Sequence, residues 1–160
     1  MKCLKVMLLV VLGLSGATTQ SQSRITIEQN YQELLERSDL VVIATPTTST
    51  ADTKEVTFFS DLLHVDAKGR QTKVEATGVE TRFECLAILK GNSQVKQFVL
   101  HHYRETASPR LEADGPLLVS FNPSDHADYL LFLVRERDGR FAPTGGQTDP
   151  GWRTITKLAD

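Results

Sequence analysis

The sequence predicts a mainly β protein: one barrel-like domain of about six antiparallel strands, with an amphipathic helix at the N-terminus and a short helix at the C-terminus. Residues 72–89 alternate between apolar and polar side chains, as a half-buried strand does. Residues 129–135 form a strong apolar strand that leads into Asp138-Gly139, a dipeptide of tight hairpins. The strand-like segments are joined mostly by short links, which favours an antiparallel barrel over a parallel sheet.

Residues 1–17 have the pattern of an export signal. Lys2 and Lys5 begin it, an apolar run covers 6–14, and Ser15-Gly16-Ala17 offers the small residues that a signal peptidase needs. The apolar run is shorter than the roughly 20 residues that span a bilayer. We therefore expect an exported protein, periplasmic or secreted, with no membrane span after cleavage. An uncleaved signal anchor is the alternative.

After the signal, we expect a disordered lead-in at 18–24 and a single domain at 25–160. Thr26 and Gln29 fit a capping box at the start of a helix that ends near Ser38. The apolar side chains of this helix recur at helical spacing: Ile27, Tyr31, Leu34 and Leu35.

Strands are expected at 40–45, 72–89, 95–103, 117–121, 129–135 and 140–142. Gly78 predicts a break or bulge in the long alternating strand. Segment 54–66 fits either a short helix lined by Val56, Phe59, Leu62 and Leu63 or an irregular apolar flap. Asp149-Pro150 predicts the cap of the C-terminal helix, which would carry Trp152, Ile155 and Leu158.

Charge and cysteine content limit the possible partners. The chain has 18 basic and 20 acidic residues; without the two signal lysines 16 basic residues remain, a net charge of about −4. This balance disfavours nucleic acid as a partner. The longest basic cluster, 135–140, is interleaved with acids and predicts a solvated hairpin tip. Cys85 is the one cysteine left, so no intramolecular disulfide can form. Its strand position predicts a buried structural thiol, with a reactive thiol or intermolecular disulfide as the alternative.

No catalytic motif is recognisable, and we expect neither an enzyme nor a cofactor. A serine nucleophile needs a sharp Gly-x-Ser-x-Gly turn, which the sequence lacks. The candidates for a metal site are His101, His102, His126 and Asp128. Adjacent His101 and His102 on a strand point to opposite faces, so only one of them could join His126 and Asp128 around zinc or copper. The competing interpretation is histidines at strand ends and turns.

Four segments carry a resemblance to known proteins: 38–42 (Ser-Asp-Leu-Val-Val), 83–91 (Phe-Glu-Cys-Leu-Ala-Ile-Leu-Lys-Gly), 129–133 (Tyr-Leu-Leu-Phe-Leu) and 138–141 (Asp-Gly-Arg-Phe). They resemble small exported bacterial proteins of unassigned role, which are similar to the OB-type barrel of netrin-like domains and tissue inhibitors of metalloproteinases. The resemblance covers roughly 38–142 and implies an OB-like barrel. The cysteine with which such inhibitors chelate the metal of the protease is missing near the expected mature start.

Three hypotheses for the function follow. The first is an exported, non-enzymatic β-barrel domain that binds a protein or cell-envelope partner. The second is a metal- or small-ligand-binding protein that uses His101 or His102 with His126. The third is protease inhibition.

Overall fold

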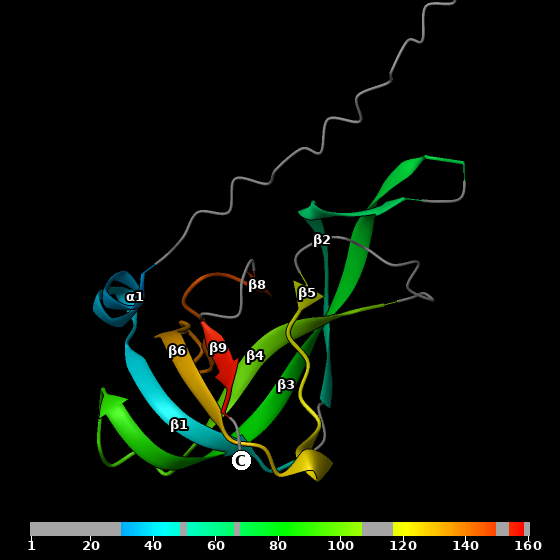
Figure 1. Ribbon diagram of the computed structural model, residues 1–160. Coiled ribbons are helices and arrows are strands. Elements are labelled where there is room, and N and C mark those ends of the chain that lie inside the picture. The colour runs from blue at the N-terminus through cyan, green and yellow to red at the C-terminus, as the bar shows by residue number, and fades with distance from the viewer. Residues whose placement is uncertain (1–29, 49–50, 66–67, 107–116, 150–153, 159–160) are drawn as a thin grey trace, which may run out of the picture.

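The computed structural model describes residues 30–48, 51–65, 68–106, 117–149 and 154–158 (Figure 1). The expected signal, lead-in and Thr26 cap lie outside the described residues. The elements are α1 (Tyr31–Arg37), β1 (Leu40–Pro46), β2 (Ala51–Val65), β3 (Gln71–Lys90), β4 (Gln97–Glu105), β5 (Leu117–Leu118), the 3-10 turn η1 (Pro123–Asp125), β6 (Tyr129–Arg135), β7 (Phe141–Pro143), β8 (Thr148–Asp149) and β9 (Ile155–Lys157).

Five strands form a closed barrel in the order β1-β3-β4-β7-β6, and β6 pairs back with β1. β2 and β9 are added to this barrel, on β3 and β6 respectively. The pairings within the barrel are antiparallel except for one parallel bridge, Leu100 with Phe141, between β4 and β7. The predicted mainly β barrel is therefore confirmed. In Figure 1 the paired ends of β2 and β3 extend well beyond the barrel.

The barrel interior is filled by the inward-facing side chains of its strands. Phe83 of β3 is fully buried and stacks on Phe98 of β4, with ring centroids 5.3 Å apart. The rings of Phe121 and Tyr129 pack edge to face with the ring of Phe83, with centroids 5.0 and 6.4 Å from it. Cys85 is half-buried beside this cluster, and burial raises the pKa of its thiol. The predicted inward face of β3 is thus the core face.

The helix α1 covers the outside of the barrel near β6. Asn30 caps it by accepting a hydrogen bond from the Glu33 amide at 2.8 Å, so this helix begins at Tyr31. Leu34 is its buried contact and packs with Val41 and Phe132. Among the described residues, no helix has the length and apolar character needed to cross a membrane.

Two sequence-based expectations are wrong. The described part of segment 54–66, residues 54–65, belongs to β2, a strand paired with β3, and is neither a helix nor an irregular flap. Its apolar residues do not follow a helical stripe, because Val56 and Phe58 are exposed while Phe59 faces Tyr103. Ile155–Lys157 is the strand β9, not a helix, since these residues pair with β6. β9 starts with the β-branched pair Ile155-Thr156, which suits a strand.

Candidate functional site

A group of charged side chains meets on the outer face of β3 and β4. It contains one residue each from β2, β3 and β4 and three from the β6–β7 loop: Glu55, Glu80, His101, Glu136, Asp138 and Arg140. We call this group the Arg140 cluster. The register pairs Glu80 with His101, so these two residues share one face, opposite to Phe83 and Phe98. The cluster therefore lies on the reverse side of the sheet that lines the core.

His101 sits between two carboxylates and is 4% exposed. Its Nδ1 lies 3.0 Å from both carboxylate oxygens of Glu136. Its Nε2 lies 2.7 Å from Glu55 Oε2, but without the alignment of a hydrogen bond. The side chain of Gln147 donates to the His101 carbonyl at 3.2 Å. The imidazole thus links β4 to β2 and to the β6–β7 loop.

Arg140 is the main positive charge of the cluster and is 18% exposed. Its guanidinium donates to Glu80 at 3.0 Å, to Glu55 at 3.2 Å and to Asp138 at 2.7 Å. Burial opposes the charge of Arg140, yet the hydrogen bonds to Glu80 and Glu55 raise its pKa above the usual range. Burial also opposes ionisation of Glu55, but the Arg140 hydrogen bond and the charge of His101 outweigh it and lower the pKa of Glu55.

Gly78 of β3 makes room for Glu55 in the cluster. A Cβ at this position would lie 2.7 Å from Thr53 Oγ1, closer than side chains allow, and 3.0 Å from Glu55 Cβ, a tight contact. The Thr53 hydroxyl donates to the Gly78 carbonyl at 2.9 Å. The predicted irregularity at Gly78 lies instead in β2, whose register shifts between Asp52 and Val56, while the β3–β4 register is continuous through Gly78.

The structure places the four candidate metal ligands in separate environments. His102 points into the barrel, where it contacts Thr81 Oγ1 at 2.9 Å and the Val119 carbonyl at 3.0 Å. Burial lowers the pKa of His102 to about 4. His126 is exposed at the end of η1 with a φ of 49°, and Asp128 accepts a 2.5 Å hydrogen bond from the Thr45 hydroxyl.

Within the described part of the chain, no three His, Cys, Asp or Glu side chains are arranged to hold a metal ion. In particular, neither strand histidine meets His126 and Asp128. His101 and His102 do face opposite sides of β4, as the sequence predicts.

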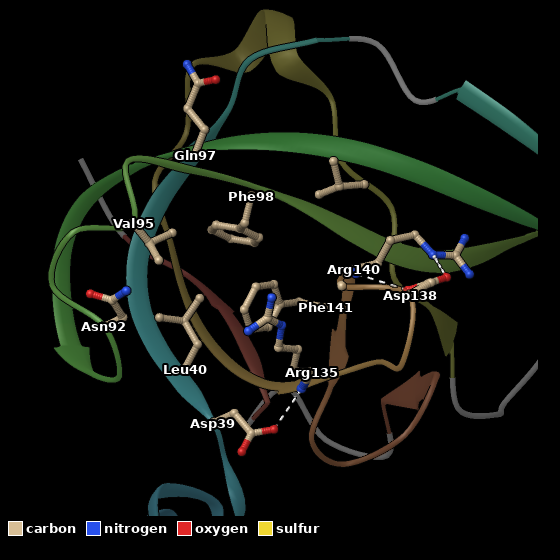
Figure 2. Close-up of a pocket in the computed structure, with 12 residues that line it drawn as sticks. Asp39, Leu40, Asn92, Val95, Gln97, Phe98, Arg135, Asp138, Arg140 and Phe141 are labelled. Atoms are coloured by element: carbon tan, nitrogen blue, oxygen red, sulfur yellow. Dashed lines mark hydrogen bonds and ion pairs between the residues drawn. The ribbon is translucent and has the colours of Figure 1, made fainter.

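An open pocket adjoins the Arg140 cluster at one end of the barrel (Figure 2). Its volume is about 740 Å³. The apolar walls of the pocket come from β1, β4, β7 and the β3–β4 loop. Polar side chains of β6 and the β6–β7 loop form the rest of its lining. The main lining residues are Leu40, Val95, Phe98, Arg135, Asp138, Arg140 and Phe141. In Figure 2 the Arg140 side chain reaches away from the pocket centre toward Asp138.

Sequence reasoning missed most of the Arg140 cluster. The interleaved charges of 135–140 predicted a solvated hairpin tip, whereas Arg140 and Glu136 are largely covered, at 18% and 28% exposure. Glycine in a long strand was the one local signal, because it marks close approach of a neighbour. The partners Glu55 and Glu80 are too far from Arg140 in sequence for any local pattern to join them.

Neither a protein-family model nor a curated protein sequence matches this chain.

Proposed function

We propose that this protein is an exported, non-enzymatic domain with an OB-type barrel, and that it binds a protein partner through β2 and the Arg140 cluster. The barrel assignment is supported by five closed strands whose order departs from chain order, since OB barrels are five-stranded Greek-key barrels. Export is the expectation drawn from residues 1–17.

The observation that carries this proposal is the exposed edge of β2. Among the described residues, β2 pairs with β3 and with no other strand, so no strand covers its second edge. Val56 and Phe58 point to one face of β2 and are 57% and 59% exposed. Proteins usually protect a free edge with charge, bulges or covering elements. An extended segment of another protein could pair with this edge and cover both side chains.

The Arg140 cluster lies beside this edge and supplies charge for recognition. Glu55 of β2 and Asp138 of the β6–β7 loop are the most exposed carboxylates, at 46% and 51%. Such a rim attracts a partner segment that carries basic residues. OB-type barrels bind ligands on their second and third strands and on the first and last inter-strand loops. β3, β4, the β1–β3 connection that contains β2, and the β6–β7 loop occupy these positions.

Site-specific photo-crosslinking in the cells that make the protein tests this function. Benzoylphenylalanine at Val56 should give one discrete crosslinked product, while the same residue at Glu84, which is exposed on the barrel, should not. Adding Phe58→Lys should abolish the Val56 product, because it places a charge in the contact. The proposal fails if Val56 gives no product, or if the products at Val56 and Glu84 are the same.

A further inference from the structure

We propose that the barrel-end pocket binds a small amphipathic carboxylate, with the apolar body of the ligand against Phe98 and Phe141 and its carboxylate on Arg135. This site does not include the β2 edge, but it shares Asp138 and Arg140 with the Arg140 cluster. Three features support it: the apolar walls of the pocket, a rim arginine without a side-chain partner among the described residues, and the size of the cavity.

The walls are apolar, and the partly buried Val95 and Phe141 expose more of them than the buried core residues Leu40 and Phe98 do. Leu40 and Phe98 are 2% and 6% exposed and belong to the barrel core, so they do not depend on a ligand for their position. Phe141 packs against Phe98 edge to face, with ring centroids 5.7 Å apart. Val95 of the β3–β4 loop packs against the same core. Apolar walls with a few polar groups are the usual composition of a small-molecule site.

The rim contains two arginines with different roles. Arg140 is fully engaged, because its guanidinium donates to Glu80, Glu55 and Asp138. The guanidinium of Arg135 has no hydrogen-bond or ion-pair partner among the described residues; only its backbone amide is bound, to Asp39 Oδ2 at 2.8 Å.

Arg135 therefore has donors available for an anion, and a guanidinium can bind a carboxylate through two parallel hydrogen bonds. Figure 2 shows Arg135 on the Phe141 side of the pocket, with Asp39 held at its backbone. An anion on Arg135 would thus lie at the edge of the apolar walls, which suits a molecule with one apolar and one charged end.

The size of the pocket limits the ligand. A volume of about 740 Å³ lies within the range of roughly 300–1,000 Å³ that holds drug-sized molecules. The pocket is open to solvent, so the charged end can keep part of its hydration while the apolar body is covered.

NMR titration of the folded domain with 4-phenylbutanoate tests the proposal. Saturable amide shifts should appear at Asn92, Phe98 and Gly139, which line the pocket. The neutral analogue 4-phenylbutanamide should bind about tenfold more weakly, because it cannot form the charge-assisted hydrogen bonds with Arg135. Arg135→Gln should weaken 4-phenylbutanoate binding by a similar factor. Arg137→Gln is the matched control, since Arg137 is exposed two residues away and does not line the pocket.

A second variant tests the apolar half of the site. Val95→Phe should block the pocket and reduce binding of acid and amide alike, while Phe58→Ser on β2 should change neither. Equal affinities for acid and amide, or an unchanged affinity in Arg135→Gln, would overturn the role of Arg135. Shifts that gather at Val56 and Phe58, or the lack of saturable binding, would overturn the pocket itself.

Discussion

The two faces of the β3–β4 sheet have different construction. The inner face, with Phe83, Phe98 and Leu100, is apolar and packs as a single cluster in the barrel. The outer face, with Glu80 and His101, is covered by charged side chains from β2 and the β6–β7 loop. Alternate residues of the same two strands supply both faces. The inner face therefore depends on shape and burial, whereas the outer face depends on charge balance.

The adjacent histidines of β4 show the contrast in one residue type. His102 on the inner face is neutral: burial, reinforced by the nearby charge of His101, lowers its pKa to about 4. His101 on the outer face is just as buried, yet it lies between the carboxylates of Glu55 and Glu136. Adjacent residues of one strand thus meet an aromatic ring on the inner face and carboxylates on the outer face.

The largest expected effect comes from deleting an inner-face ring. Phe83→Ala should lower the free energy of unfolding by about 3–5 kcal/mol, because it leaves a cavity among Phe98, Phe121 and Tyr129. The adjacent outward residue is the control: Glu84→Ala should change the free energy by no more than about 0.5 kcal/mol. Urea unfolding measures both. Small, equal effects would mean that the inner face does not hold the barrel together.

The second prediction uses pH to test the inner face. The pKa of His102 is near 4 in the folded state and about 6.5 when unfolded, so between these values the unfolded chain binds more protons. Stability conferred by neutral His102 is complete above pH 6.5 and is lost as the pH falls toward 4. Between pH 6.5 and 5 the loss should be about 1.5 kcal/mol.

Urea unfolding at several pH values measures this slope. His102→Gln, which keeps a polar side chain near Thr81 and Val119, should flatten it. If the variant kept the full slope, a group other than His102 would be responsible for the pH dependence.

The same division explains what the sequence could predict. Inner-face residues alternate along each strand, so local pattern was enough to find β1, β3, β4 and β6, the inward side of Phe83 and the hairpin at Asp138-Gly139. The Gly139 φ of 94° is the left-handed conformation that such a turn requires.

The elements that local pattern missed depend on distant partners. In β2 the apolar residues Val56 and Phe58 are exposed, so the positions of its apolar residues do not indicate a single buried face. β9 is three residues long and is a strand because β6 lies beside it. Likewise, Glu55 and Arg140 form an ion pair across 85 positions of sequence, and no periodicity can join residues so far apart.

The smallest expected effect tests the outer face. Arg140→Gln removes the charge that Glu55, Glu80 and Asp138 share, and should lower the free energy of unfolding at pH 7 by roughly 1–2 kcal/mol. This loss of unfolding free energy should be smaller at acidic pH. The pKa of Glu55 is lowered in the folded protein, so the stability that this carboxylate contributes is present above its unfolded pKa and disappears as the pH falls through the folded value.

Arg104→Gln is the matched control for this change. Its ion pair with Asp52 is half-exposed on both sides, so solvent screens it and the loss should be much smaller. Urea unfolding at pH 7 and pH 3.5 separates the cases. Two results would contradict this prediction: a loss of unfolding free energy in Arg140→Gln no larger than in Arg104→Gln, or a loss that is the same at both pH values. Either result would mean that the Arg140 cluster does not hold β2 and the β6–β7 loop on the barrel. A confirmed difference would instead mean that the acidic rim and the β2 edge beside it are positioned as one surface, because Glu55 belongs to both.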